Sequence, residues 1–180
     1  MSVTVLWAAK GGSGTTVVTA TFALSCSTDS LLVDLDGELP AVLGDEPCET
    51  WTLDRLPELA ATADVLAVAL PLNDDTRGIV SASVIGAMKP GAVFVNVGRG
   101  DLVDEPALID ALTSGRLGGA GLDVFATEPL PADSPIWDLP NVIVTPHSSA
   151  HTAASGENAA EIFFANLTRY ARGEPLHNEH

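Results

Sequence analysis

Residues 92–101 have the sequence Ala-Val-Phe-Val-Asn-Val-Gly-Arg-Gly-Asp, and this stretch decides the fold. Its first half is a run of β-branched and aromatic residues, which is typical of a strand buried on both faces of a parallel sheet. The run ends in Asn96-Val97-Gly98-Arg99-Gly100, so one arginine stands just beyond the predicted strand. Open α/β sheets bind ligands at the carboxyl ends of their strands, and we therefore expect Arg99 to face a ligand site.

Similar apolar segments lie on both sides of this stretch, and helical patterns alternate with them along the chain. The predicted strands are 2–9, 31–36, 65–70, 92–97, 118–125 and 142–145, and the later helices are 81–89, 105–114 and 154–172. This alternation predicts an α/β fold: a three-layer, doubly wound, mainly parallel, Rossmann-like sheet of about six strands. A chain of 180 residues suits one domain, so we expect a single nucleotide-binding domain over residues 1–180. In the proline-rich loop 129–141, Trp137 is the predicted packing anchor.

The composition limits the classes of partner. Hydrophobic residues make up 46% of the chain, and 24 acidic against 8 basic residues give a formal net charge of −16. Such a charge repels nucleic acid and anionic membrane surfaces. The sequence has no apolar run of roughly 20 residues and no basic region before its first apolar run, so we expect a soluble, cytoplasmic protein.

Two further chemical groups follow predicted strands. Glu128 lies in Ala-Thr-Glu-Pro-Leu-Pro, and His147 lies in Val-Thr-Pro-His. Taken singly, a loop arginine, glutamate or histidine is usually a solvated surface residue. Together, Arg99, Glu128 and His147 would supply a charged binder for an anion, a carboxylate and an imidazole at one edge of the sheet.

A glycine-rich turn follows the first predicted strand and opens a predicted helix, where backbone N–H groups are free to bind phosphate. The turn is Lys10-Gly11-Gly12-Ser13-Gly14-Thr15-Thr16. It fits the dinucleotide pattern GxGxxG only in part, because Val17 stands where a third small residue belongs. Asp34 or Asp36, at the end of the second strand, could accept hydrogen bonds from a ribose and would repel a 2′-phosphate, which favours NAD over NADP.

Residues from about 51 to 175 resemble the NAD-binding domain of the D-isomer-specific 2-hydroxyacid dehydrogenases. Several motifs in the same order carry the resemblance: Leu70-Pro71-Leu72 with Thr76-Arg77-Gly78, Met88-Lys89-Pro90-Gly91, Asn96-Val97-Gly98-Arg99-Gly100, Gly121-Leu122-Asp123-Val124-Phe125, Glu128-Pro129-Leu130 and Asn141-Val142-Ile143-Val144-Thr145-Pro146-His147. The resemblance implies hydride transfer between NADH and a small 2-oxo acid.

The same resemblance implies a role for each matching residue. Arg99 would hold the carboxylate and carbonyl of the acid. His147 would be the general acid and base, and Glu128 would orient its imidazole and favour the protonated form. Asp123 would lie near the nicotinamide carboxamide. The remaining cofactor-binding positions in these motifs are Pro71, Val97 and Gly98.

Residues 1–45 resemble a different group, the partitioning and septum-site P-loop ATPases, whose loop has the form KGGxGKT. Lys10 matches the signature lysine, and Gly11, Gly12, Gly14, Thr15 and Thr16 would surround the phosphates. Thr15 replaces the lysine that normally spans the outer phosphates, so we expect binding of ATP or ADP without hydrolysis. On this interpretation the chain is a chimera, joined between about Pro40 and Trp51.

Three hypotheses therefore remain open from the sequence. The first is an NAD-binding dehydrogenase domain whose substrate domain is absent, so that turnover is weak or lost. The second is a module that binds ATP or ADP, and the third is a chimera without native activity. We expect no metal site, and the helix 105–114 and the final helix are candidate faces for a homodimer.

Overall fold

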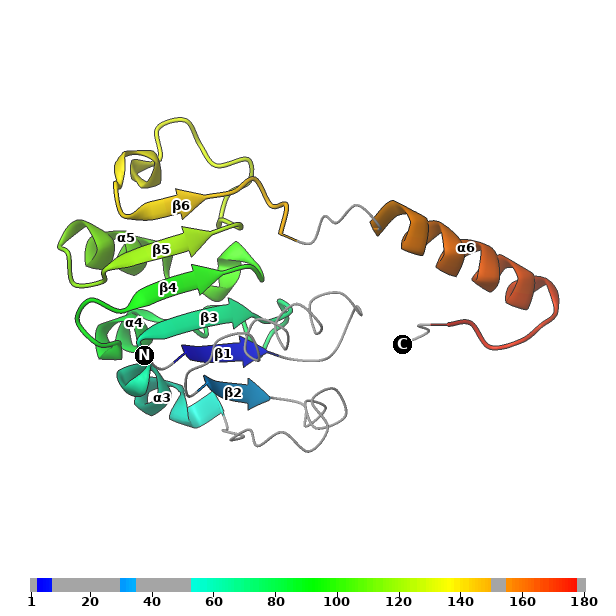
Figure 1. Cartoon of the computed structure of the whole chain (residues 1–180), viewed down its shortest axis with the longest axis horizontal. Coiled ribbons are helices and arrows are strands. Elements are labelled where there is room, and N and C mark those ends of the chain that lie inside the picture. Colours follow the sequence, from blue (N-terminus) through cyan, green and yellow to red (C-terminus); the bar gives the residue numbers. More distant parts are fainter. Residues whose placement is uncertain (1–2, 8–29, 35–52, 150–154, 178–180) are drawn as a thin grey trace. The chain divides into compact units, whose positions relative to one another are not determined.

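The structure is a computed structural model that describes residues 3–7, 30–34, 53–149 and 155–177. The chain divides into two compact units, residues 1–149 and residues 150–180. The first unit is built around a six-stranded sheet (Figure 1). Its strands are β1 (Val3–Trp7), β2 (Ser30–Asp34), β3 (Val65–Ala69), β4 (Val93–Asn96), β5 (Gly119–Leu122) and β6 (Val142–Val144).

All neighbouring strands of this sheet are parallel, in the order β2-β1-β3-β4-β5-β6. The chain runs from β1 to one neighbour, β2, and then crosses back to the other neighbour, β3. The strand order therefore reverses direction at β1, and sheets of this kind bind ligands in the crevice at such a point. The prediction of a parallel, Rossmann-like α/β sheet of about six strands is confirmed.

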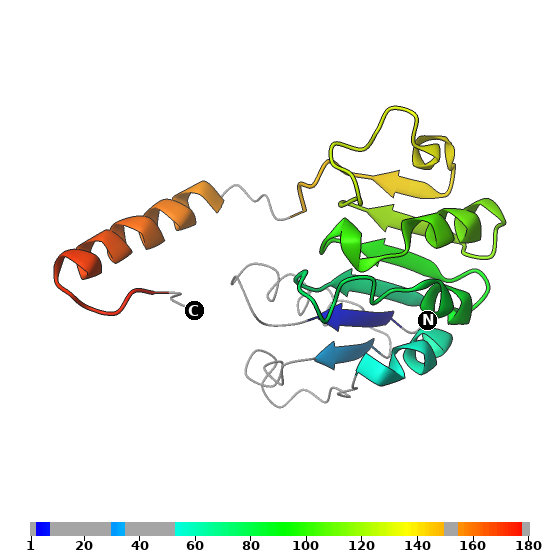
Figure 2. The ribbon, with the colours of Figure 1, turned by 180° about the vertical axis from the view of Figure 1, so that it is seen from behind.

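Three helices of the first unit form one layer against a face of the sheet (Figure 2). They are α3 (Leu56–Thr62), which continues the 3-10 helix η1 (Leu53–Arg55), α4 (Ala82–Ala87) and α5 (Glu105–Thr113). The side chain of Asp104 caps α5 by accepting a hydrogen bond of 3.1 Å from the backbone N–H of Ala107. Gly115 has a φ of +72°, a conformation that glycine adopts freely, and α5 ends just before it, as predicted.

The core lies between this helical layer and the central strands. Phe94 of β4 and Leu66 and Val68 of β3 are fully buried, and they belong to the same cluster as Leu59 of α3 and Leu108 of α5. The alternate side chains of β3 and β4 are half-buried, so none of residues 65–70 and 92–97 is exposed, in keeping with their apolar runs without alternation.

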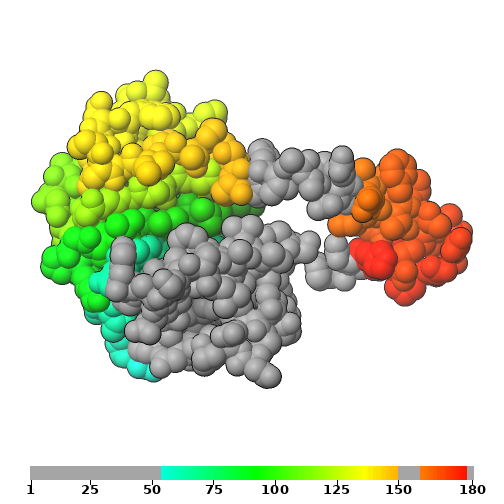
Figure 3. All heavy atoms as spheres, in the orientation of Figure 1, coloured from blue at the N-terminus to red at the C-terminus, as the bar shows by residue number. Residues whose placement is uncertain are grey.

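The region after β5 differs from the prediction in two respects. The strand predicted over residues 118–125 is shorter, because β5 ends at Leu122 and the chain then leaves the sheet. The loop after it contains the 3-10 helix η3 (Pro135–Asp138), where Ile136 is buried and Trp137 is 53% exposed. The prediction that Trp137 anchors the loop is therefore wrong, since its neighbour does so. In the space-filling view, this loop and β6 lie along one edge of the first unit, in yellow and gold (Figure 3).

The second unit contains α6 (Ser155–Ala171), which confirms the predicted final helix. Its large apolar side chains are exposed, and Phe163 and Phe164 contact each other edge to face, with ring centroids 5.5 Å apart. The exposed set is Ile162, Phe163, Phe164, Leu167 and Tyr170. Among the helices of the described segments, none has the length and apolar character needed to cross a membrane.

Candidate active site

The three predicted catalytic residues all follow neighbouring strands of the sheet. Arg99 comes after β4, Glu128 lies in the loop after β5, and His147 comes after β6. These strands are parallel neighbours, so their carboxyl ends lie at one edge. The register confirms this arrangement, because the last paired residues are Asn96 with Leu122 and Leu122 with Val144.

The turn that carries Arg99 is fixed by the buried side chain of Asn96, which is 1% exposed. Its Oδ1 accepts a hydrogen bond of 3.0 Å from the backbone N–H of Gly98, and its Nδ2 donates one of 3.0 Å to the carbonyl of Arg99. Both neighbours of the arginine have to be glycine. A Cβ on Gly98 would lie 2.8 Å from the carbonyl oxygen of Leu70, and one on Gly100 would lie 1.9 Å from the carbonyl carbon of Phe125.

Arg99 itself is exposed at this turn. Its Nη1 donates a hydrogen bond of 2.6 Å to the carbonyl of Gly98. None of the ion pairs found among the described residues involves Arg99. By contrast, Arg77 forms an ion pair with Asp101. Among the described residues, no carboxylate therefore forms an ion pair with the guanidinium of Arg99.

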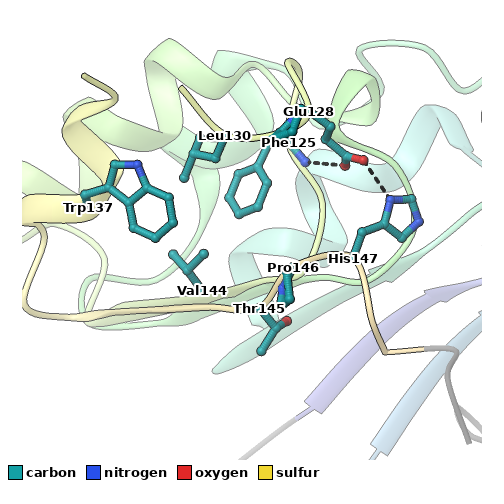
Figure 4. A pocket seen from close by; sticks show the side chains of 9 residues that line it. Phe125, Glu128, Leu130, Trp137, Val144, Thr145, Pro146 and His147 are labelled. Atoms are coloured by element: carbon teal, nitrogen blue, oxygen red, sulfur yellow. Dashed lines mark hydrogen bonds and ion pairs between the residues drawn. The ribbon is translucent and has the colours of Figure 1, made fainter. Parts of the chain in front are cut away.

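Glu128 and His147 lie in direct contact, with the Oε2 of the glutamate 2.7 Å from the Nδ1 of the histidine (Figure 4). The other oxygen of Glu128 accepts a hydrogen bond of 3.0 Å from the backbone N–H of Phe125. The hydrogen bond with His147 is the main reason that the pKa of Glu128 lies below its usual value. The Phe125 N–H and the charges of His147 and Arg99 lower that pKa further, against the effect of burial. Glu128 is therefore a carboxylate at neutral pH.

Glu128 contacts only Nδ1 of His147, so the other ring nitrogen, Nε2, does not take part in this contact. With Nδ1 facing a carboxylate, Nδ1 carries a proton and Nε2 can exchange one. The side chain of His147 is 43% exposed, so a proton on Nε2 can exchange with solvent. His147 has a left-handed backbone, with a φ of 52°, which is uncommon for a residue other than glycine.

Asp123 is 3% exposed, and its carboxylate faces the turn that contains His147. Oδ1 accepts hydrogen bonds of 2.5 Å from the hydroxyl of Thr145 and 2.8 Å from the N–H of Ser148. Oδ2 accepts one of 2.9 Å from the N–H of Ser149. Burial alone would raise the pKa of Asp123, but the hydrogen bonds from Ser149, Thr145 and Ser148 outweigh it and lower the pKa to about 2.

An apolar cavity of about 670 Å³ adjoins the Glu128–His147 pair on the side of β6. Its other lining residues are Phe125, Pro129, Leu130, Trp137, Val144, Thr145 and Pro146. Figure 4 shows the second ring nitrogen of His147 pointing away from this cavity, so the cavity does not lie at that nitrogen.

The structure describes some of the predicted cofactor-binding residues and not others. Pro71 follows β3, the neighbour of β1, and Val97 and Gly98 follow β4, the next strand along, so all three lie at the carboxyl edge of the sheet. Pro71 and Val97 are half-buried, whereas Gly98 is buried. Asp34 is the last residue of β2 and pairs with Trp7 of β1. The glycine-rich loop, which contains the predicted residues Gly11, Gly12, Gly14, Thr15 and Thr16, lies outside the described residues.

Within the described segments, no group of three or more histidine, cysteine, aspartate or glutamate residues has the geometry of a metal site. Sequence reasoning missed Asn96 as a residue of the site, and it missed the contacts of Asp123 with residues 145–149. Asn96 belongs to one of the family motifs, but only its hydrogen bonds show that its side chain holds the turn of Arg99.

Comparison with known proteins assigns the family. Residues 40–149 match the family model described as the NAD-binding domain of D-isomer specific 2-hydroxyacid dehydrogenase. The chain is 43% identical over 123 residues to glyoxylate/hydroxypyruvate reductase B of Pectobacterium carotovorum, covering 68% of this chain and 38% of that one. It is 44% identical over 119 residues to hydroxyphenylpyruvate reductase of Plectranthus scutellarioides, covering 66% and 38%. The chain thus spans about two fifths of the length of these relatives.

Solved structures give the same family. A D-isomer specific 2-hydroxyacid dehydrogenase from Xanthobacter autotrophicus Py2, in complex with NADPH and MES, superposes with a TM-score of 0.80 at 35% identity, over 99% of this chain and 70% of that one. An NADPH-dependent glyoxylate/hydroxypyruvate reductase from Sinorhizobium meliloti gives 0.74 at 30% identity, over 98% and 54%. These relatives do not support the predicted P-loop ATPase resemblance of residues 1–45, the chimera, or a site for ATP or ADP. The chain belongs to the D-isomer-specific 2-hydroxyacid dehydrogenase family and contains its NAD-binding domain.

Proposed function

We propose that this chain takes part in the reversible reduction of a small 2-oxo acid to a 2-hydroxy acid, with NADH as the hydride donor. The contact of 2.7 Å between His147 and Glu128, at the sheet edge that also carries Arg99, is the observation that supports this most strongly. It provides a proton donor beside an anion binder, which is the combination that reduction of a 2-oxo acid requires.

The residues at the sheet edge fit a dinucleotide. The strand order reverses at β1, and Pro71 and Val97 offer half-buried apolar surface at the ends of the two following strands. Pro71, Val97 and Gly98 would hold the nicotinamide end of the cofactor. When bound, the nicotinamide supplies the hydride that adds to carbon 2 of the acid.

Arg99 has the chemistry needed to bind the substrate. Its guanidinium is always charged, and its forked N–H groups match the two oxygens of a carboxylate. The glycines on either side hold the backbone of this turn against β3 and the loop after β5. We propose that Arg99 holds the carboxylate and polarises the adjacent carbonyl of the acid.

His147 and Glu128 would manage the proton. In the reduction, Nε2 of His147 donates its proton to the carbonyl oxygen of the acid as carbon 2 gains the hydride, and in the oxidation it takes the proton back. Glu128 holds the imidazole through Nδ1 and balances the positive charge of its protonated form. Its lowered pKa keeps it charged across the neutral range.

The preference for NADH over NADPH is proposed from Asp34. This residue ends β2, the strand beside β1, where a carboxylate can accept hydrogen bonds from the hydroxyls of the adenosine ribose. A negative charge there repels the 2′-phosphate of NADPH. Proteins named as glyoxylate/hydroxypyruvate reductase are among the similar sequences, which supports a small 2-oxo acid as the substrate class.

Calorimetric titration of the purified chain with NADH, NADPH, ATP-Mg and ADP tests the cofactor. We expect NADH to bind more tightly than NADPH, and Asp34→Ala to reduce this preference by about tenfold, the equivalent of about 1.4 kcal/mol. Tighter binding of ATP-Mg or ADP than of NADH contradicts the proposal. If Asp34→Ala keeps the same preference for NADH over NADPH, the role assigned to Asp34 is wrong, but the proposed reaction is not affected.

A further inference from the structure

Thr76 belongs to a small set of buried polar side chains at the carboxyl edge of the sheet. Among the described residues, the polar or charged side chains that are buried are Thr76, Asn96 and Asp123. Asn96 ends β4, and the other two follow β3 and β5. A buried hydroxyl is almost always hydrogen-bonded, so the partners of Thr76 show which part of the chain it holds.

The hydroxyl of Thr76 closes the loop after β3. It donates a hydrogen bond of 2.7 Å to the carbonyl of Pro71, the shortest of its contacts, and accepts one of 2.9 Å from the backbone N–H of Asn73. The residue is 3% exposed, so water does not compete for these bonds. Residues 71–76 therefore form a closed loop around one buried hydroxyl.

The side chain of Asn73 closes the same loop from its solvent side. Its Oδ1 accepts hydrogen bonds of 3.0 Å from the N–H of Asp75 and 2.9 Å from the N–H of Thr76. The backbone carbonyl of Asn73 accepts a further one of 3.0 Å from the N–H of Arg77. Contacts within the protein are therefore enough to fix the shape of this loop.

This network limits what Pro71 can offer to a ligand. Proline has no backbone N–H, and the carbonyl of Pro71 is bonded to Thr76. Pro71 is half-buried, so the part of it that remains accessible is apolar. The N–H of Val97, after the neighbouring strand β4, is also occupied, because it donates to the carbonyl of Val68 at 3.0 Å. An apolar surface suits the flat ring of a nicotinamide better than a phosphate or an amide.

We infer that Thr76 is a positioning residue, whose buried hydroxyl closes the loop 71–76 and thereby sets Pro71 for contact with the nicotinamide ring. The identity of this ligand rests on the proposed function, although the closed loop itself does not. Loss of the hydroxyl therefore weakens binding of the nicotinamide end of the cofactor. It leaves the adenosine end, which we assign to Asp34, unaffected.

Amide hydrogen exchange reports on the closed loop in protein without a nucleotide. Thr76→Val keeps nearly the same side-chain shape but removes the hydroxyl, so the N–H of Asn73 loses its acceptor. We expect this N–H to exchange roughly tenfold faster in Thr76→Val. Thr76→Ser restores the hydroxyl and should restore the rate of the wild type. An unchanged rate in folded Thr76→Val overturns the inference.

Asn73→Ala tests the same loop without a change in the core, in case Thr76→Val does not fold. It removes, at an exposed position, the oxygen that accepts from the N–H groups of Asp75 and Thr76. We expect both N–H groups to exchange roughly tenfold faster and NADH to bind about tenfold more weakly. Unchanged exchange and unchanged binding in this variant count against the inference.

Thr62→Val is the matched control for the loss of a threonine hydroxyl. Thr62 is the last residue of α3, and its hydroxyl donates a hydrogen bond of 2.8 Å to the carbonyl of Leu59. It precedes β3 and therefore lies toward the amino ends of the strands, at the opposite edge of the sheet. We expect Thr62→Val to leave nucleotide binding and the exchange of residues 71–76 unchanged.

Calorimetric titration with NADH and with ADP-ribose, which lacks the nicotinamide, tests the contact with the cofactor. We expect Thr76→Val to raise the dissociation constant of NADH about tenfold, to leave that of ADP-ribose unchanged, and Thr76→Ser to restore the affinity for NADH. A merely structural role would change both constants by the same factor or neither, and either result overturns the inference. If the wild-type chain binds neither ligand, the proposed function fails and the role toward the nicotinamide falls with it. The exchange rates then still decide whether Thr76 closes the loop.

Discussion

The Nδ1 of His147 lies 2.7 Å from the Oε2 of Glu128, although the two residues follow different strands, β6 and β5. The contact lowers the pKa of Glu128 and leaves Nε2 of the imidazole for proton exchange. It also shows that the loop after β5 and the turn after β6 act as one unit at the sheet edge.

Replacing Glu128 with Gln should reduce turnover with NADH and a 2-oxo acid by at least tenfold, within the range of general acid catalysis. An amide can still face Nδ1, but it does not balance a charged imidazole. Stopped-flow absorbance at 340 nm measures the rate. Glu58→Gln is the matched control, since Glu58 is an exposed partner of Arg55 on α3. Equal rates in the wild type and Glu128→Gln would contradict the assigned role.

Replacing Arg99 with Lys should raise the KM for the 2-oxo acid by roughly tenfold while the affinity for NADH stays the same. Lysine keeps the charge but loses the forked N–H groups that match a carboxylate. Arg77→Lys is the control, because Arg77 is exposed and paired with Asp101. A KM that stays the same in Arg99→Lys, or that changes equally in both variants, would contradict the assigned role of Arg99.

Gly100→Ala should destabilise the fold by about 3 kcal/mol or more, because the new Cβ would overlap the backbone of Phe125. Gly86→Ala, within α4, meets no atom within 4 Å and should stabilise the helix by up to about 1 kcal/mol. Urea denaturation followed by circular dichroism compares the two. Similar midpoints for both variants would contradict the close contact between the Arg99 turn and the loop after β5.

The pKa of Asp123 predicts how stability depends on pH. A carboxyl group whose pKa is about 2 in the folded protein, and 3.8 ordinarily, stabilises the fold above pH 4 by about 2 kcal/mol. That contribution disappears as the pH falls from about 4 to about 2. The difference in unfolding free energy between the wild type and Asp123→Asn should therefore shrink over this interval. A difference that stays constant from pH 6 to pH 2.5 would count against the hydrogen bonds assigned to Asp123.

Much of the fold could be predicted because buried strands appear in the sequence as runs of apolar residues. Strands β3 and β4 bury one face in the core and half-bury the other, and residues 65–70 and 92–97 are continuous apolar runs. Arg99, Glu128 and His147 could be placed at one edge, because parallel neighbours end on the same side of a sheet. The resemblance to a known family implies the roles that we propose for them.

Other features depend on contacts that have no periodicity. The turn 145–149 gives no sign in the sequence that His147 has a positive φ or that Asp123 binds the residues around it. Trp137 was predicted to be the packing anchor of the loop 129–141, yet the 3-10 helix turns Ile136 inward instead. The P-loop prediction rested on the glycine-rich turn with its lysine and threonines. Glycine-rich turns of several kinds bind phosphate, so such a turn alone does not identify the nucleotide.

Transfer of deuterium from [4-²H]NADH to hydroxypyruvate tests the central claim most directly, because mass spectrometry detects even slow turnover. We predict that the wild-type chain forms glycerate with deuterium at carbon 2. We also predict that His147→Asn lowers the yield by roughly a hundredfold while it still binds NADH. Deuterated glycerate no higher than in the sample without protein, or an equal yield from His147→Asn, would contradict the account.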